Sequence, residues 1–216
     1  MATAERPAPE QRIVMHGISW RTYEKLLEER GERTVPRMCY NQGSLEMMSP
    51  SKEHEKYRRL IGRLIDEWTV ANGIEIASAG ATTLKREVSQ RGAEADECFY
   101  IRDERLMRGR RKIDLNVDPP PDLAFEIDIS SSSIDKLVVY AALGVREVWL
   151  FNGETLTIYE LQSDGRYHAI EKSVLLPGFP VKDVPEWISR ASTTGETKWT
   201  GAFRDWVRTR SEPGGD

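Results

Sequence analysis

The chain has 216 residues and a formal net charge of −4, with 39% hydrophobic and 31% charged residues. This length suits one domain with some terminal extension, and the composition is ordinary for a soluble globular protein. No apolar run approaches the roughly 18 residues that span a bilayer, and the polar, Pro-rich start lacks the apolar segment of a signal peptide. These features predict a cytoplasmic protein without a membrane partner. The acidic balance counts mildly against general DNA binding but leaves room for a local basic patch.

The first part of the chain predicts a helix, a strand pair and a long helix after a polar leader. Ser19 is a suitable N-cap for the first helix, and Gly31 is a suitable stop. A turn-forming segment at residues 41–44 separates two short β-type runs. The long helix begins near Ser51, and its apolar residues recur at helical spacing until Gly73. The predicted elements are the leader 1–12, the helix 19–31, the strands 35–40 and 45–48, and the helix 51–72.

The middle and the end of the chain predict more strands, one more helix and an amphipathic tail. Three prolines at 119–121 stop any helix and lead into a strand, and Gly144 closes the next helix. Trp199, Phe203 and Trp206 lie at helical spacing in the tail, where they can pack on the body or on a partner. The predicted elements are the strands 74–78, 82–88, 95–101, 122–129, 147–151, 155–161 and 167–171, the charged loop 102–118 and the helix 133–143.

Helices and strands alternate in the middle of the chain, and antiparallel strands follow them. This order predicts an α/β fold with a mixed central sheet flanked by helices. We place a flexible leader at residues 1–16, the folded domain at residues 17–190 and an amphipathic tail at residues 191–216. Cys39 and Cys98 lie in strand-like segments without the spacing of a metal site, which indicates buried, reduced thiols.

Carboxylates line one face of the predicted strand 122–129. Period-2 alternation places Leu123, Phe125, Ile127 and Ile129 on one face and Asp122, Glu126 and Asp128 on the other. A carboxylate on a buried face needs a charged partner or a metal ion. Alternation alone does not say which face is buried, so a solvent-facing row of charges is an equally good interpretation. Asp96 lies in another strand-like run, where an ordinary surface or turn aspartate is the simpler interpretation.

Three further features each have a chemical and an ordinary interpretation. Lys136 lies in the first turns of the helix that returns over the sheet, so it either points back to the carboxylates or is solvated. His54 begins the inner face of the long helix and is either a catalytic or a capping histidine. The cations of residues 102–112 either follow a phosphate backbone or belong to a solvated loop. Tyr140 is interpreted as a core residue.

Four segments resemble, in order, the signature of the Uma2 family, also called DUF820. Residues 121–150, PDLAFEIDISSSSIDKLVVYAALGVREVWL, resemble its "PDLxxEI" strand, its Ser-rich turn, its Lys and Tyr on a helix, and its "GVxEYW" motif. Residues 43–54 resemble its "GxLxxMSPxxxxH" opening, and Ala95-Asp96 stands where the family carries Pro-Asp. Residues 176–179, LPGF, resemble its C-terminal element. The resemblance covers about residues 17–190.

This resemblance implies membership of the PD-(D/E)xK nuclease superfamily and a restriction-endonuclease-like fold. It implies a site in which Asp96 and Glu126, on adjacent strands, hold Mg²⁺ or Mn²⁺. Asp128 occupies the position of the superfamily's in-strand lysine, and we predict it as a further metal ligand. Lys136 on the following helix is then the natural substitute for that lysine.

Glu46 and His54 complete the predicted site from the N-terminal part of the chain. The resemblance implies DNA as the partner, and homodimerisation is expected by family analogy. The first functional hypothesis is a metal-dependent endonuclease that hydrolyses DNA, including a nicking or structure-selective one. The second is a catalytically inactive nuclease-fold module with a binding or regulatory role, which Asp128 and the acidic composition favour. A third is a protein-interaction module that uses the tail between Trp199 and Trp206.

Overall fold

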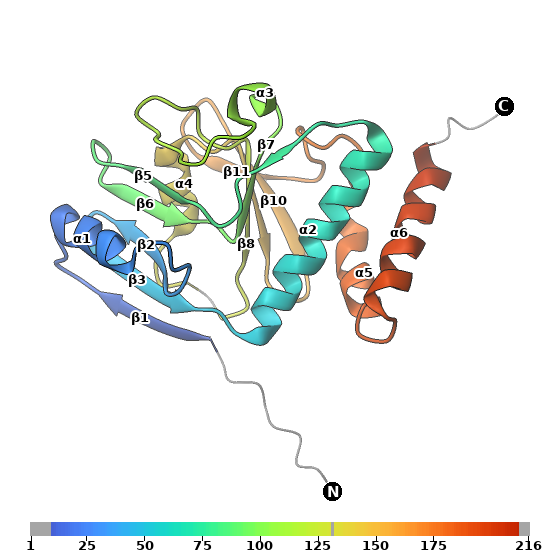
Figure 1. The fold of residues 1–216 in the computed structure, drawn as a ribbon, viewed down its shortest axis with the longest axis horizontal. Helices are drawn as coiled ribbons and strands as arrows, with labels where there is room; N and C mark the ends of the chain where they lie inside the picture. Colours follow the sequence, from blue (N-terminus) through green and yellow to red (C-terminus); the bar gives the residue numbers. More distant parts are fainter. Residues whose placement is uncertain (1–9, 131, 212–216) are drawn as a thin grey trace, which may run out of the picture.

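Two β-sheets meet at the centre of the molecule, and helices cover their faces (Figure 1). The computed structural model describes residues 10–130 and 132–211. Residues 1–9 of the predicted leader and residues 212–216 of the predicted tail lie outside this range. The prediction of an α/β fold with a mixed central sheet and flanking helices is confirmed. The sequence did not predict that the strands divide between two sheets.

The five-stranded sheet is antiparallel throughout, in the order β1-β3-β2-β6-β5. Helix α1 packs on one of its faces through Trp20 and Tyr23. The hydroxyl of Ser19 caps this helix by accepting a hydrogen bond of 3.2 Å from the Thr22 amide, as its N-cap position predicts. The elements are β1 (Gln11–Met15), α1 (Trp20–Arg30), β2 (Arg37–Asn41), β3 (Ser44–Ser49), β5 (Thr83–Arg86) and β6 (Arg91–Glu94).

The predicted flexible leader is wrong for residues 11–15, which form strand β1. Gln11 lies opposite Ser49 and Met15 lies opposite Leu45, so β1 covers the edge of β3. A sheet edge carries unpaired backbone groups, and a passing segment can satisfy them whatever its side chains are. No residue of β1 is fully buried, and its partner strand lies about 34 residues further along the chain, so this pairing is not set by local sequence.

The six-stranded sheet has the order β11-β10-β9-β8-β7-β4. Strands β8 and β9 are parallel and are joined by helix α4, whereas the other neighbours are antiparallel. The elements are β4 (Ala77–Ser78), β7 (Glu97–Tyr100), β8 (Leu123–Ile127), α4 (Lys136–Leu143), β9 (Glu147–Phe151), β10 (Leu156–Leu161) and β11 (Tyr167–Ile170). The short helix α3 (Glu104–Met107) lies in the segment predicted as a charged loop.

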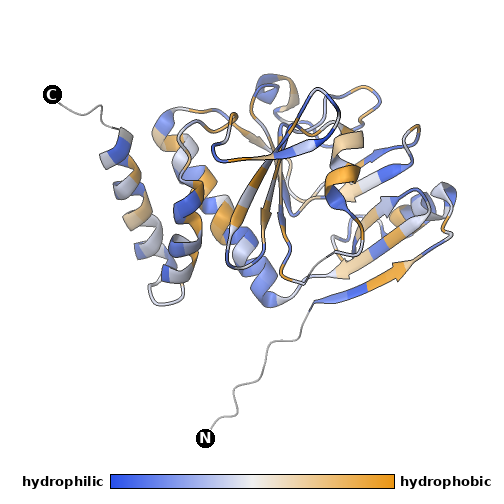
Figure 2. Cartoon of the chain, turned by 180° about the vertical axis from the view of Figure 1, so that it is seen from behind, coloured by the Kyte–Doolittle hydropathy of each residue, from blue (hydrophilic) through white to orange (hydrophobic). Residues whose placement is uncertain are grey.

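Helices cover both faces of the six-stranded sheet. Helix α2 (Lys52–Asn72) crosses one face, and α5 (Val184–Arg190) and α6 (Glu196–Ser211) lie beside it. The apolar residues of β8 alternate as predicted, with Phe125 in the core under α2 and Ala124 in the core under α4. Seen from behind, the strands of this sheet are rich in hydrophobic residues (Figure 2). None of the helices in residues 10–211 has the length and apolarity needed to cross a membrane.

The C-terminal tail packs on the body of the protein. Trp199 and Phe203 of α6 are buried in the core cluster that includes α2, and the Trp199 indole donates a hydrogen bond of 2.7 Å to the carbonyl of Trp187. Arg204 of α6 also forms an ion pair of 2.6 Å with Glu67 of α2. Of the two docking alternatives for the tail, the structure shows the intramolecular one, so these aromatic residues are already covered.

Substitution of Phe203 tests this packing. Its ring is fully buried and lies edge-on to Trp187. Phe203→Ala should therefore lower the free energy of unfolding by about 3–5 kcal/mol, because it removes a buried ring and leaves a cavity. Lys198→Ala, at an exposed position of the same helix, should change it by less than about 0.5 kcal/mol. Urea unfolding measures both, and equal effects of the two substitutions would contradict the docked position of α6.

Candidate active site at the junction of the two sheets

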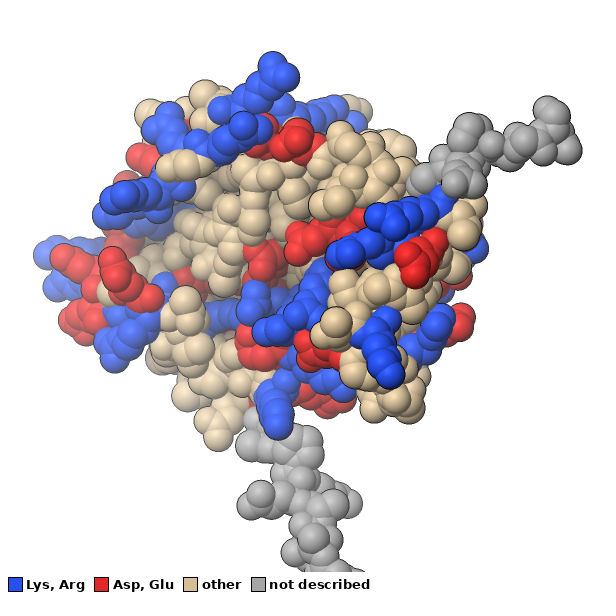
Figure 3. Space-filling model, turned by 45° about the vertical axis from the view of Figure 1, so that its right-hand side comes forward, with Lys and Arg blue, Asp and Glu red and all other residues tan. Residues whose placement is uncertain are grey.

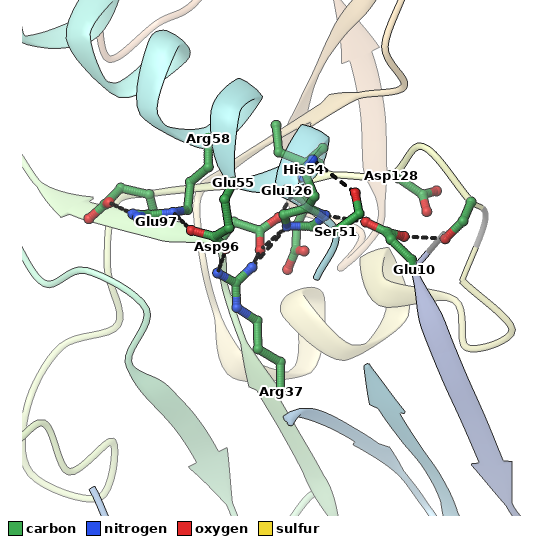
Figure 4. Close-up of polar contacts among 12 residues, drawn as sticks. Glu10, Arg37, Ser51, His54, Glu55, Arg58, Asp96, Glu97, Glu126 and Asp128 are labelled. Atoms are coloured by element: carbon green, nitrogen blue, oxygen red, sulfur yellow. Dashed lines mark hydrogen bonds and ion pairs between the residues drawn. The ribbon is translucent and has the colours of Figure 1, made fainter. Parts of the chain in front are cut away.

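Asp96 lies where the chain passes from the five-stranded to the six-stranded sheet, between β6 and β7. Its side chain is fully buried. One carboxylate oxygen, Oδ2, accepts a hydrogen bond of 2.6 Å from the Ile127 amide at the end of β8. Strands β7 and β8 are antiparallel, and Glu97 lies opposite Phe125. Extending this register by one residue places Asp96 beside Glu126. The predicted pairing of these two acids on adjacent strands is thus present in the fold (Figure 4).

Glu126 is buried on the α4 side of β8. Its Oε2 accepts a hydrogen bond of 2.6 Å from Lys136 Nζ, and its Oε1 accepts one from the Tyr140 hydroxyl. Lys136 and Tyr140 are four residues apart on α4 and therefore share one face of the helix. Of the two interpretations of this strand face, the structure shows the buried one. Lys136 points back to the carboxylate of Glu126. This is the position that it needs if it replaces the superfamily's in-strand lysine.

The charge of Lys136 depends on Glu126. Burial by itself lowers the pKa of Lys136, but the negative charge of Glu126 and its hydrogen bond raise the pKa, which ends above the ordinary value of 10.5. Burial and the same carboxylate also raise the pKa of Tyr140 well above 10. At neutral pH, Lys136 is therefore a cation and Tyr140 a neutral hydrogen-bond donor, and both face Glu126.

His54 holds Asp96 from the first turn of α2. It is fully buried, and its Nε2 lies 2.8 Å from Asp96 Oδ1 and 2.9 Å from Arg37 Nη1. Its Nδ1 contacts the carboxylate of Glu10. Because protein groups occupy both ring nitrogens, the geometry favours a positioning role for His54 over proton transfer with a substrate.

Arg37 of β2 is a member of the site that the sequence did not predict. Its guanidinium contacts Asp96 through Nη1 and donates a hydrogen bond of 2.7 Å to Glu55 through Nη2. It is also buried. A signal was present, because Arg37 and Cys39 are two apart on a strand whose inner face is buried, and a cation there needs an acid.

Glu46 and Asp128 belong to a neighbouring group of contacts around Arg12. Glu46 accepts hydrogen bonds of 2.7 Å from Arg12 and 2.8 Å from the Ser133 amide. Asp128 Oδ1 accepts one of 3.1 Å from the Ser132 amide and lies 3.6 Å from Arg12 Nη2. These contacts fasten the connection between β8 and α4, and so they position Lys136.

The metal-ligand set of Asp96, Glu126 and Asp128 stays a prediction. Strand β8 ends at Ile127, and the Asp128 side chain that follows it contacts Arg12 and the Ser132 amide. Within residues 10–130 and 132–211, no group of three or more His, Cys, Asp and Glu side chains is arranged to hold a metal ion. Asp96 and Glu126 still offer the carboxylate oxygens that a hard divalent cation prefers. The donor chemistry of this pair fits Mg²⁺ or Mn²⁺, although Arg37 and Lys136 contact the same carboxylates.

The basic loop and the two cysteines, which the sequence also singled out, form no hydrogen bond or ion pair with Asp96 or Glu126 among the described residues. The loop that begins at Arg102 is held at the start of β8, where Asp122 Oδ2 accepts the amides of Ile101 and Arg102 at 2.7 and 2.8 Å. This is the opposite end of β8 from Glu126, so the basic loop does not border the site. Cys39 and Cys98 are buried and free, as predicted, and burial raises the pKa of the Cys39 thiol to about 12.

Comparison with known proteins identifies the family of the chain. The model of the Uma2 family, described as "Putative restriction endonuclease", matches residues 20–189. The chain belongs to the Uma2 family. A crystal structure of "a putative nuclease belonging to DUF820" from Anabaena variabilis ATCC 29413 is similar with a TM-score of 0.55 and 17% sequence identity. The similarity covers 79% of this Uma2 chain and 99% of that chain, and at this identity it shows the shared fold. No curated protein matches the chain.

The ion pair between Lys136 and Glu126 predicts that substitutions of the two residues have non-additive effects on the free energy of unfolding. Lys136→Met should lower the free energy of unfolding by about 3–5 kcal/mol, because it leaves the Glu126 carboxylate buried without its cation. Adding Glu126→Gln should restore part of that loss, since the double variant buries no charge at this point. Denaturant unfolding of Lys136→Met, of Glu126→Gln and of the double variant, with exposed Lys25→Met as the control, measures the coupling. A double variant as unstable as the sum of the two single variants would contradict the pairing.

The contacts of Glu10 predict that the N-terminal segment contributes to the free energy of unfolding in a pH-dependent way. Burial raises its pKa, but hydrogen bonds from His54 and Ser130 and the charges of His54 and Arg12 lower it to about 2, from an ordinary value of 4.5. Because the folded-state pKa is depressed, the stabilisation is present above pH 4.5 and is lost as the pH falls towards 2.

Unfolding measured across this pH range tests the assignment. The difference in unfolding free energy between the wild type and Glu10→Gln should be largest near neutral pH and should shrink between pH 4.5 and 2. Glu28→Gln, at an exposed position of α1, should differ from the wild type by the same amount throughout. A constant difference for Glu10→Gln would show that its carboxylate makes no ionic contact in the folded state.

Proposed function

We propose that this protein is a metal-dependent endonuclease that hydrolyses phosphodiester bonds in DNA. The observation that carries the proposal is the buried group of Asp96, Glu126 and Lys136, in which two acids from adjoining strands meet a lysine from the next helix. The Uma2 family description supports a nuclease. The solved structure with the same fold is described in similar terms, as "a putative nuclease belonging to DUF820".

Asp96 and Glu126 would hold Mg²⁺ or Mn²⁺ between them. When bound, such an ion polarises a phosphoryl oxygen and lowers the pKa of a bound water. Lys136 carries a positive charge, so it can stabilise the charge that builds up on the phosphate oxygens during hydrolysis. His54 keeps Asp96 oriented, and Tyr140 keeps Glu126 oriented. All of these residues except partly exposed Lys136 are buried, and each has a defined partner, which favours preorganisation.

A second candidate is a nuclease-fold module that binds or regulates without cleaving. The observation that favours it is that each carboxylate already has a cation of its own chain, Arg37 for Asp96 and Lys136 for Glu126. Asp128 in place of the in-strand lysine points the same way. In this case, the ion pairs would be permanent parts of the fold. The predicted homodimer and the predicted cytoplasmic location stay predictions.

Cleavage assays with site variants separate the two candidates. Wild type should nick or cut plasmid or single-stranded DNA only when Mg²⁺ or Mn²⁺ is present. Asp96→Asn and Glu126→Gln should each reduce the rate by more than about a hundredfold, because each removes a carboxylate charge that would hold the metal ion. Asp164→Asn, in the exposed turn between β10 and β11, is the control and should keep the wild-type rate.

Calorimetric titration of the metal ion completes this test. Wild type and Asp164→Asn should bind Mn²⁺, and Glu126→Gln should not. A wild-type protein that neither binds the ion nor cleaves DNA would refute the endonuclease proposal and leave the non-cleaving module. Metal-dependent cleavage that survives in both Asp96→Asn and Glu126→Gln would place the active site elsewhere.

A further inference from the structure

A row of four cations follows one side of helix α2 and begins next to the candidate active site. Lys52, Lys56, Arg59 and Arg63 are spaced at i, i+4, i+7 and i+11, which places them on one face of a helix. The first three are exposed, and the Arg63 side chain is 31% exposed. We call these four residues the α2 cation row. The apolar residues of α2 occupy the opposite face, towards the core.

The row leads away from the site on the face formed by α2 and the C-terminal helices. His54, which contacts Asp96, lies two residues after Lys52, in the same first turn of α2 but on the opposite, buried side of the helix. A hollow of about 570 Å³ lies between the first turns of α2 and the pair Ser192 and Glu196. It is lined by the first three cations of the row, by Tyr57 and by the acids Glu53, Glu55 and Glu196. Glu55 also contacts Arg37 of the site at 2.7 Å. With this side turned forward, Lys and Arg side chains form a band across the face, with acidic groups beside them (Figure 3).

We propose that the α2 cation row binds the phosphate backbone of the DNA strand that enters the candidate active site, an inference that rests on the proposed endonuclease function. The row spans about 17 Å at 1.5 Å per residue, which matches the rise of about five nucleotides in one strand of B-DNA. Five of the residues 52–63 are Lys or Arg and two are Glu, so this segment is basic in an acidic protein. The positive end of the helix dipole at Lys52 adds to the attraction for phosphate.

The present partners of the row are weak and exchangeable. Glu196 of α6 lies 2.9 Å from Arg63 and 3.5 Å from Arg59, and its side chain is 46% exposed. Ion pairs exposed to this degree contribute about 0–1 kcal/mol. Lys56 donates a hydrogen bond of 3.2 Å to the exposed Ser192 hydroxyl. A phosphate can therefore take the place of the Glu196 carboxylate at little cost, and Glu196 opposes DNA binding while it is charged.

The basic loop at residues 102–112 is the natural comparison. It carries more cations than the row, but it lies at the far end of β8 from Glu126. Arg108 and Arg110 in this loop pair with Glu104 and Asp118. Exposed Arg105, Arg111 and Lys112 have no ion pair in the described part of the chain, and they provide a matched control for charge removal.

Equilibrium DNA binding tests the proposal without requiring catalysis. Fluorescence anisotropy of a short labelled duplex and single strand, in EDTA and between about 50 and 200 mM salt, gives the Kd and its salt slope. Substituting Lys52, Lys56 and Arg59 together by Gln should raise the Kd at least about tenfold and lower the salt slope by about one for each phosphate that is no longer neutralised. The control, with Gln at positions 105, 111 and 112, should keep the Kd within about twofold. Glu196→Gln should tighten binding.

The outcomes separate this proposal from the proposed function. Equal weakening by the two triple variants, or no binding of DNA by the wild type, would overturn the α2 cation row as the binding surface. Wild-type cleavage that the row variant retains at an unchanged KM would also overturn it, while leaving the nuclease intact. Binding that depends on the row but is never followed by cleavage with Mg²⁺ or Mn²⁺ supports the row and refutes the endonuclease. Circular dichroism of the triple variants confirms that these exposed changes leave the fold intact.

Discussion

The ion pair between Glu126 and Lys136 is the contact on which the centre of this structure depends. Every residue of β8 is buried, so the Glu126 carboxylate lies inside a strand that otherwise carries Leu, Ala, Phe and Ile. Transfer of such a charge from water costs several kcal/mol even after relaxation, and the attraction of one lysine only roughly offsets this cost. A well-packed apolar pair would stabilise a fold at least as well. The ion pair is therefore poorly explained by stability alone, and it is better explained by the chemistry of the carboxylate.

Glu147 shows that burial of an acid does not by itself indicate an active site. It is also fully buried, on the neighbouring strand β9. Its oxygens accept hydrogen bonds from two backbone amides, of Val174 and Leu175, and from the side chains of Trp149 and Ser173. These donors are neutral and are largely fixed by the backbone, so Glu147 fastens the segment after β11 to the sheet. Glu126, by contrast, is held by the ends of two side chains, which can move to admit a phosphate or a cation.

The sequence predicted the parts of the site that local periodicity controls. Period-2 alternation placed Glu126 opposite the apolar face of β8, and the helical spacing of α2 placed His54 on its inner side. Helical spacing also places Tyr140 one turn after Lys136, and the structure shows that this core residue donates a hydrogen bond to Glu126. Arg37, Arg12 and Glu10 come from elements that meet the site through β-sheet pairing and sheet packing. Such long-range contacts leave no local period, and the pairing of β1 with β3 shows the same limit.

The charges of the site also constrain how a divalent cation would enter it. Asp96 and Glu126 supply two negative charges, and Arg37 and Lys136 already balance them. Because like charges repel strongly in a buried site, an added ion would replace one of these cations and would not simply join them. Arg37 is the more readily displaced of the two, because it already shares its guanidinium with partly exposed Glu55. Glu55 also lines the hollow beside the α2 cation row. Movement of Arg37 towards Glu55 would therefore couple the exposure of Asp96 to the surface on which DNA is proposed to lie.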